Sequence, residues 1–517
     1  MNRQIRGLGL AISLLFIALF VQLNYLQVIH TTKLAANPLN RATVVNSYTL
    51  PRGNILSADG VTLATSVPTN DQLKYLREYP TGSLFEEVTG YYSYIYGSDG
   101  AEAYYNGVLT GKNTPFKLPT SINGLKKLLT NSNNTESITL TLLDKLQKIA
   151  QSGLAGRDGS VVALDPKTGA ILAMYSNPTF NPNGLTSHNP TAVQASYKAI
   201  TAIPGGPLDS PAYRQIFFPG SSFKIVTASA VYDHDPTLAT TTLPTLTRLQ
   251  LPDTTTQLHN FAGESCGGQI LELFTVSCDT GFAKIGLDLG ATNLYDEARA
   301  FGFDLTPPID LPFAVKSNFP APSSFIGNLP TLAYSAIGQE NVEASPLQMA
   351  LVGAAIADGG QIMKPHILAS ITNSQNQVVS TYKPTKWLQA TSQATAQQVT
   401  KLMVSVVSSP NGTGTVAQIP GVQVAAKTGT AQTGTHHTDD WFVAFAPAND
   451  PQIVVSVVLP NQGNLVSDQG GTLAAPIAKS MIEGYLSPSS GAPSPSTTSV
   501  SNQSSTSTSR TTSPTVG

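Results

Sequence analysis

Ser221 and Lys224 are separated by two residues at a predicted helix start. They follow residues 217–220 (FFPG) and precede an apolar run at 225–228, and a Pro-Gly pair before a serine is typical of a helix start. Side chains three residues apart share one face of a helix. A serine hydroxyl becomes a nucleophile when a base lies within hydrogen-bond reach, and a partly desolvated lysine can be that base. Taken alone, the pair fits a helix cap equally well.

Two further polar clusters follow at a distance along the chain. Ser277 and Asp279 lie within the apolar stretch 272–286 (ELFTVSCDTGFAKIG), where a buried loop or helix end would present a hydroxyl and a carboxylate. After a strand-like run at 422–426 come Lys427, Thr428, Gly429 and Thr430. A glycine in that position lets a substrate backbone lie close. Similar tetrads elsewhere are better interpreted as turns and loops, so only the three clusters in this order point to chemistry.

The elements that must position these side chains are strands at both ends of the catalytic half, with helices between them. The pattern predicts hairpins at 160–174 and 441–459, helices near 223–232 and 347–357, and a closing helix at 476–486 with proline in its first turn. Strands from distant segments with helices between them predict an α+β domain built on an antiparallel sheet.

The preceding segment carries no recognisable catalytic cluster. Residues 51–64 predict a strand-turn-strand, because the Asp-Gly pair at 59–60 favours a hairpin turn. Apolar residues at helical spacing predict a connecting helix over 140–152. We therefore predict an amino-terminal domain over 31–157 and a catalytic domain over 158–486.

The two ends of the chain predict an anchor and a disordered tail. Residues 8–29 are long and apolar enough to cross a bilayer, and they lack the short core and small-residue cleavage site of a cleaved signal peptide. Arg3 and Arg6 precede this span, which predicts residues 1–30 as a cytoplasmic tip and single-pass anchor, with the rest of the chain outside. Residues 487–517 are mostly Ser, Thr, Pro and Gly and are predicted to be disordered.

Charge and cysteine content limit the kinds of partner and ligand that we expect for this chain. The net charge is −2 and charged residues make up 12% of the chain, so we expect no nucleic-acid partner. Cys266 and Cys278 are the only cysteines, and an oxidising compartment would favour a disulfide between them, with two free buried thiols as the alternative. Two thiols and a nearby His259 do not suffice for a metal site, so none is expected.

The three clusters read PGSSFK (219–224), SCDTGFA (277–283) and KTGTAQ (427–432). With them in this order, the sequence resembles the class B, or monofunctional, penicillin-binding proteins. Further matches are PRGNILSADG at 51–60, GSVVALDPKTGAILAM at 159–174, IGQE at 337–340 and WFVAFAP at 441–447. The resemblance runs from about residue 50 to residue 486. It implies a penicillin-binding/serine β-lactamase-like transpeptidase domain on an amino-terminal pedestal domain, with no cofactor.

The resemblance also implies roles for the clusters. Ser221 would attack the penultimate D-alanine of a peptidoglycan stem peptide ending in D-Ala-D-Ala, and Lys224 would take its proton. Ser277 would relay a proton to the leaving amine, and Lys427 would supply positive charge. The backbone amides of Ser221 and Thr430 would form an oxyanion hole, while Thr428 and Thr430 hold the substrate carboxylate. An amine of a second stem peptide would complete the cross-link, and β-lactams would acylate the serine.

One residue departs from the common family pattern. Many members carry asparagine where this chain has Asp279, and a carboxylate there would favour the charged forms of Lys224 and Lys427. The family further implies docking of a SEDS-type membrane glycosyltransferase on the pedestal domain. A role in septation or in elongation cannot be deduced from these residues.

Other enzymes and receptors share parts of this pattern. A bifunctional class A enzyme would need a glycosyltransferase domain, for which segment 31–157 is too short. A β-lactamase would release its acyl group quickly and would rarely carry an anchor, and a β-lactam sensor usually has several membrane spans. A scaffold with an inactive site stays open as an alternative.

Overall fold

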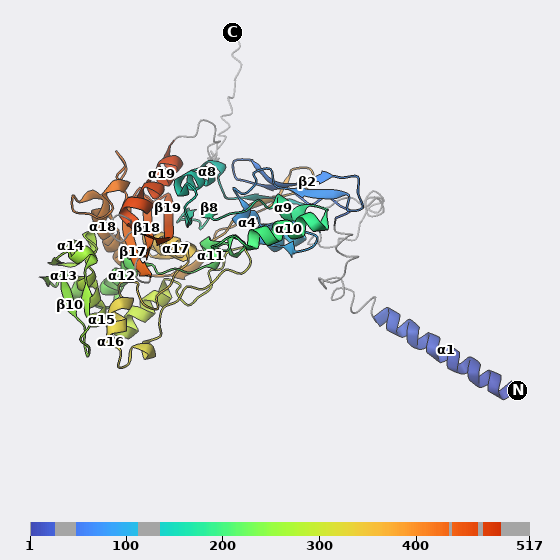
Figure 1. Ribbon diagram of the computed structural model, residues 1–517, viewed down its shortest axis with the longest axis horizontal. Coiled ribbons are helices and arrows are strands. Elements are labelled where there is room, and N and C mark those ends of the chain that lie inside the picture. Colours follow the sequence, from blue (N-terminus) through green and yellow to red (C-terminus); the bar gives the residue numbers. More distant parts are fainter. Residues whose placement is uncertain (1, 26–47, 112–134, 434–436, 464–468, 488–517) are drawn as a thin grey trace, which may run out of the picture. The chain divides into compact units, whose positions relative to one another are not determined.

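Figure 1 shows the computed structural model, in which residues 2–25, 48–111, 135–433, 437–463 and 469–487 are described. Helix α1 (Asn2–Asn24) contains a stretch, Arg6–Asn24, that is long and apolar enough to cross a membrane. This agrees with the predicted single-pass anchor. The last residues of the predicted span, 26–29, and nearly all of the predicted tail lie outside the described residues.

A five-stranded antiparallel sheet organises the catalytic half, in the order β17-β18-β19-β7-β8. Its strands are β7 (Gly159–Leu164), β8 (Ile171–Asn177), β17 (Ala425–Thr433), β18 (His437–Ala446) and β19 (Ile453–Gln462). Both predicted hairpins are confirmed, since β7 pairs with β8 and β18 with β19. The strand-like run at 422–426 was placed too early: β17 includes the whole Lys427–Thr430 cluster, which the pairing with β18 holds in extended form.

Helices cover both faces of this sheet, so its central strands are buried on both sides. Helices α8 (Asp144–Leu154) and α19 (Ala475–Leu486) pack together on one face, and α17 (Pro346–Ala357) packs on the other. Helices α12 (Lys224–His234) and α18 (Gln393–Ser408) lie against α17. The predicted helix over 140–152 begins only at Asp144, because residues 137–140 pair as a strand.

A second sheet lies in the amino-terminal half, in the order β15-β14-β6-β1-β2-β3. Its strands are β1 (Ile55–Leu56), β2 (Thr62–Pro68), β3 (Tyr75–Glu78), β6 (Ser137–Leu140), β14 (Leu368–Thr372) and β15 (Val378–Thr381). The predicted strand-turn-strand at 51–64 is confirmed by the antiparallel β1–β2 pair. Two of the six strands come from beyond residue 158, so a division of the chain at that position cuts through this sheet.

The described residues also form further strands and helices. The strands are β4 (Tyr92–Ser93), β5 (Gly97–Ser98), β9 (Leu243–Leu246), β10 (Arg248–Gln250), β11 (Gln257–His259), β12 (Cys266–Gly268), β13 (Gln361–Met363) and β16 (Lys386–Gln389). The helices are α4 (Glu86–Thr89), α5 (Gly100–Tyr104), α6 (Asn106–Leu109), α9 (Asn183–Thr186), α10 (Pro190–Thr201), α11 (Pro211–Arg214), α13 (Thr237–Thr240), α14 (Ile270–Thr275), α15 (Asp279–Ala300) and α16 (Leu329–Ser335).

A buried ion cluster joins the strands and helices of the amino-terminal half. The Glu102 carboxylate is fully buried on α5 and accepts from Arg52 Nη2 at 2.8 Å and from Arg77 Nε at 2.5 Å. The hydroxyl of Tyr79 donates to the same carboxylate at 3.2 Å. Burial alone would raise the pKa of Glu102, but the two guanidinium groups hold it below its usual value. Both oxygens of the charged Glu102 carboxylate are therefore paired with guanidinium groups, while Arg77 Nη2 is buried without a hydrogen-bond partner among the described residues.

Candidate active site

Ser221 lies in a tight turn at the amino end of α12. Residues Gly220–Phe223 form a single 3-10 turn, and the α-helix begins only at Lys224. The α-helix therefore begins one turn later than the start predicted at Ser221. The turn is tight because Ser222 Oγ donates to the Pro219 carbonyl at 2.7 Å. Gly220 has φ +51° and donates to the Gly338 carbonyl at 2.9 Å. A Cβ at Gly338 would lie 2.2 Å from the Gly220 oxygen, so this close approach requires glycine.

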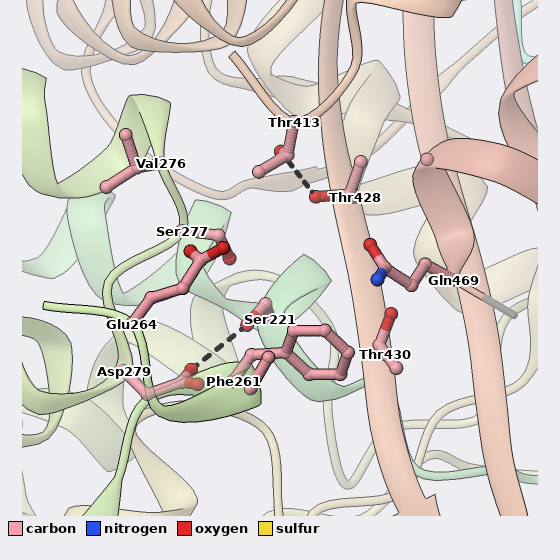
Figure 2. Close-up of a pocket in the computed structure, with 12 residues that line it drawn as sticks. Ser221, Phe261, Glu264, Val276, Ser277, Asp279, Thr413, Thr428, Thr430 and Gln469 are labelled. Atoms are coloured by element: carbon pink, nitrogen blue, oxygen red, sulfur yellow. Dashed lines mark hydrogen bonds between the residues drawn. The ribbon is translucent and has the colours of Figure 1, made fainter. Parts of the chain in front are cut away.

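Lys224 is fully buried and is held by the second cluster. Its Nζ donates to Asp279 Oδ1 and to the Ser277 carbonyl, both at 2.7 Å, and reaches Ser277 Oγ at 3.4 Å. Ser221 Oγ donates to the same Asp279 oxygen at 3.3 Å, as Figure 2 shows. One carboxylate oxygen therefore links the Ser221 hydroxyl to the Lys224 amine.

Lys427 approaches from β17 on the other side of Ser277. Its Nζ donates to Ser277 Oγ at 2.8 Å and to the Thr428 carbonyl at 2.9 Å. The Ser277 hydroxyl thus lies between two amino groups. Its backbone has φ +60°, a conformation that costs a non-glycine residue of order 1 kcal/mol or more and is typical of functional sites. The three clusters predicted from the sequence meet in one place.

Both lysines lose basicity in this environment. Burial lowers the pKa of Lys224, and the carboxylate of Asp279 only partly offsets that effect. Burial also lowers the pKa of Lys427 well below its usual value, and the charge of Lys224 lowers it further. The expectation that Asp279 favours the charged lysines describes the direction of its effect, but burial outweighs it. Both amines therefore hold their protons less tightly than an exposed lysine does.

The third cluster lines a cavity of about 360 Å³ beside the serine. Thr428 Oγ1 lies 2.7 Å from Thr413 Oγ1, and Thr430 Oγ1 accepts from the Gly470 amide at 3.3 Å. A Cβ at Gly429 would lie 2.6 Å from the Pro219 carbonyl, so glycine allows β17 to run against the serine turn. The two threonine hydroxyls point from the strand toward the same space as Ser221.

A second lobe of about 450 Å³ opens on the other side of Ser221. The two lobes share Ser221, Phe261, Ala262, Asp279 and Thr430. The remaining lining of the second lobe is rich in amides and aromatic rings: Gln257, Leu258, His259, Asn260, Tyr334, Ile337, Gln339 and Gln432. The serine therefore stands at the junction of two spaces, as a reaction between two large substrates needs.

Several lining residues carry no signal in the sequence. Thr413 and Gln469 line the first lobe, yet both come from segments without a motif. Asn260 is buried and accepts from the Thr280 amide at 2.8 Å, which fixes the start of α15 beside Asp279. A buried amide or a loop threonine has no characteristic spacing, so only the fold identifies it.

Cys266 and Cys278 form a disulfide, the first of the two alternatives that the sequence left open.

A nucleophilic serine with a buried amine as its base, facing a hydroxyl-lined cavity, defines a serine acyltransferase. Comparison with known proteins narrows this class. Residues 159–483 match the penicillin binding protein transpeptidase domain, and residues 52–136 match the penicillin binding protein A dimerisation domain. The chain therefore belongs to the penicillin-binding protein transpeptidase family, in its class B, which confirms the resemblance and the α+β transpeptidase fold.

Individual relatives cover almost the whole chain. The "Peptidoglycan D,D-transpeptidase PbpA" of Mycolicibacterium smegmatis is 35% identical over 504 residues, which cover 94% of this chain and 99% of the relative. The protein of the same name from Mycobacterium tuberculosis is 34% identical over 502 residues, with the same coverage. A solved ceftriaxone acyl-enzyme complex of penicillin-binding protein A from M. tuberculosis is 32% identical, has a TM-score of 0.77, and the match covers 86% of this chain and 100% of that one.

Proposed function

We propose that this chain is a peptidoglycan D,D-transpeptidase that cross-links stem peptides through an acyl-Ser221 intermediate and is acylated by β-lactams. The observation that carries the proposal is the convergence of Ser221, Lys224 and Ser277 beside a cavity that the two serines line, with Lys224 buried and its pKa lowered. The relatives that share 34–35% of its sequence are named for the same reaction.

The proton path runs among the groups around Asp279, since Ser221 Oγ and Lys224 Nζ both donate to its Oδ1 atom. Lys224 in its neutral form takes the proton of Ser221 as the hydroxyl attacks the carbonyl carbon of the penultimate D-alanine. The ammonium so formed is stabilised by Asp279 at 2.7 Å. Ser277, which lies within reach of both lysines, passes a proton to the nitrogen of the departing D-alanine. An amine then takes the acyl group, or water does so in a D,D-carboxypeptidase side reaction.

The third cluster would bind the anionic parts of the donor. The amides of Ser221 and Thr430 would hold the oxyanion, with a contribution of about 3 kcal/mol per donor. Thr428 and Thr430 would hold the terminal carboxylate, and Lys427 behind them would supply positive charge. The support is that both threonines line the cavity beside Ser221.

We place the catalytic domain outside the cell, with the amino terminus of α1 in the cytoplasm. Arg3 and Arg6 lie in the first turns of α1, and positive charge favours the cytoplasmic end of a span. A disulfide in the catalytic half supports an oxidising compartment. Fusion of a periplasm-dependent reporter to the carboxyl end should be active, and activity only of a cytoplasmic reporter would overturn the orientation.

Residues 31–157 would form the pedestal that docks a SEDS-type membrane glycosyltransferase. Deleting this segment would remove four strands of the six-stranded sheet, so point substitutions are the better test. Leu50 and Tyr104 are 44% and 52% exposed. Changing both to aspartate should reduce co-purification with the glycosyltransferase, whereas Val379→Asp, at a position 51% exposed on β15, should not. Equal co-purification of all variants would count against docking here.

Mass spectrometry after penicillin treatment tests the enzymatic proposal. The peptide that contains Ser221 should gain the mass of the intact antibiotic and keep it for hours, whereas a β-lactamase would lose it within seconds. Ser221→Ala should abolish the adduct, and Ser222→Ala, which removes the neighbouring buried hydroxyl, should retain it. In a strain depleted of the protein, Ser221→Ala should fail to restore growth. Restored growth would favour an inactive scaffold.

A further inference from the structure

One carboxylate on the wall of the first lobe has no role in the steps above. Glu264 follows the short turn Phe261–Gly263 and lines the same cavity as Ser221 and Ser277. In Figure 2 it lies on the wall opposite Thr428, Thr430 and Gln469. Asp279, the other acid in this lining, is paired with Lys224, whereas the Glu264 side chain has no ion pair or hydrogen bond within the described part of the chain.

The backbone of Glu264 is held firmly beside the catalytic loop. Asn260 Nδ2 donates to the Glu264 carbonyl at 3.0 Å, while Asn260 Oδ1 accepts from the Thr280 amide at 2.8 Å. Two residues beyond Glu264, the disulfide joins Cys266 to Cys278, the residue between Ser277 and Asp279. Glu264 is thus attached on both sides to the loop that carries the second cluster. The backbone of Glu264 therefore keeps its place relative to Ser277, while the side chain is exposed to solvent at the wall of the cavity.

A carboxylate in this lobe works against the donor. The donor and β-lactams both bring an anionic carboxylate to the threonine wall, and a second anion in the same space repels it. No lysine or arginine side chain lines the lobe among the described residues. The charge of Glu264 therefore favours a different occupant of the lobe, one that is cationic.

We propose that Glu264 binds the ammonium group of the acceptor and so selects a cationic amine for the second half of the reaction. This inference rests on the proposed transpeptidase function. The leaving amine departs on the side of Ser277, and the incoming amine must approach the same carbonyl carbon from the same side. Glu264 stands in that lobe, and it is a positioning residue that acts on binding of the acceptor.

The chemical step balances as follows. The acceptor binds as R–NH₃⁺ and gives one proton to bulk water, with which the open cleft exchanges. The free amine attacks the acyl carbon, so that a C–N bond forms and the C–O ester bond to Ser221 breaks. The second proton of the amine returns to Ser221 Oγ through Lys224. The attacking nitrogen regains positive charge as the C–N bond forms, so the carboxylate stabilises the bound ammonium and the transition state about equally, and Glu264 improves binding of the acceptor with little effect on the chemical step.

Aminolysis of a preformed acyl-enzyme tests the proposal. The full-length protein is acylated with a thioester analogue of the donor, and the transfer rate is followed against acceptor concentration for a peptide with a free side-chain ammonium and for neutral hydroxylamine. Glu264→Gln should raise the half-saturating concentration of the cationic peptide about three- to five-fold, the range of exposed charge pairs, with little change in the maximal rate. It should leave hydroxylamine unaffected. Added salt should remove the difference between wild type and variant.

Controls separate this inference from the proposed function. Asp296→Asn removes an exposed carboxylate from α15 and should change neither acceptor. Glu264→Lys should weaken the cationic acceptor further than Glu264→Gln. Equal effects of Glu264→Gln on both acceptors, or none on either, would overturn the inference while the acyl-enzyme still forms. Failure of the thioester to acylate the wild-type protein would instead refute the transpeptidase proposal.

Discussion

Two buried clusters in this molecule combine the same charges in different ways. In the amino-terminal half, Glu102 is paired with Arg52 and Arg77. In the active site, Asp279 shares its surroundings with Lys224 and Lys427. Each cluster therefore has two cations and one carboxylate, and in each the residues come from distant segments of the chain.

The two clusters differ in the type of buried cation, which is arginine in the first and lysine in the second. A guanidinium keeps its proton at any physiological pH and forms planar paired bonds with a carboxylate, so the Glu102 cluster is a fixed connection. A lysine gives up its proton when it is desolvated, and only Lys224 of the two lysines touches a carboxylate through an ion pair. The same charge count thus gives a fixed ion cluster in one place and lysines with lowered pKa values in the other.

Lys224→Arg should have the largest effect, because it would turn the second cluster into a copy of the first. A guanidinium cannot take the serine proton, and loss of a general base costs about 10²- to 10⁴-fold. The acylation rate constant of a fluorescent penicillin, measured by stopped flow, should fall by that factor. Lys284→Arg, on the exposed surface of α15, is the matched control. Acylation by Lys224→Arg at near the wild-type rate would show that Lys224 is not the base.

Arg52→Ala should break the first cluster and leave the second intact. Removing one partner of a buried ion pair costs about 3–5 kcal/mol, so the urea midpoint of unfolding should fall. Folded molecules should still be acylated at the wild-type rate. Arg248→Ala, an exposed residue on β10, should change the midpoint little. A slower acylation in folded Arg52→Ala would mean that the two clusters are coupled.

The pH dependence of acylation tests the same contrast between the two clusters, with a smaller expected effect. Because Lys224 must be neutral, the rate should rise with pH and level off above its pKa, which burial lowers from 10.5. Asp279→Asn removes the carboxylate that raises this pKa, so the inflection should move to lower pH. Measuring the acylation rate of both proteins as a function of pH gives the position of this inflection. An inflection that moves to higher pH, or an equal shift in Asp296→Asn, would contradict this assignment.

Stability should rise with pH in both clusters, but over different pH windows. Glu102 has a lowered pKa, so its contribution is present above the ordinary value near 4.5 and is lost as the pH falls through the lowered one. The lysines also have lowered pKa values, so the unfolded chain binds more protons than the folded one below 10.5, and stability again rises with pH, over this more alkaline window. Urea midpoints at several pH values should show loss at the acidic end. Their constancy below pH 4 would contradict the assignment for Glu102.

Much of the catalytic half could be predicted because its signals are local. The hairpins at 160–174 and 441–459 are apolar runs bounded by turns, and Ser221, Ser277 and Lys427 each stand in a short recognisable cluster. The position of β17 was harder to predict from the sequence, because the polar residues Lys427–Thr430 resemble the end of a strand until the pairing with β18 is known.

The remainder depends on contacts between distant segments. Nothing in residues 368–381 indicates that they complete a sheet begun at residue 55. The buried amide of Asn260 and the carboxylate of Glu264 gain their importance only because the turn that carries them lies against Ser277. Local periodicity contains no information of this kind.

The shared sheet also bears on how the protein is made. Strands β1, β2, β3 and β6 leave the ribosome early, but their neighbours β14 and β15 follow more than 220 residues after β6, since Leu140 ends β6 and Leu368 begins β14. Until then the free edge of β6 is an unpaired template for other chains. Synthesis of the chain through β15 must therefore precede completion of this sheet, and a truncated product ending before residue 368 would present an unpaired strand edge to other chains.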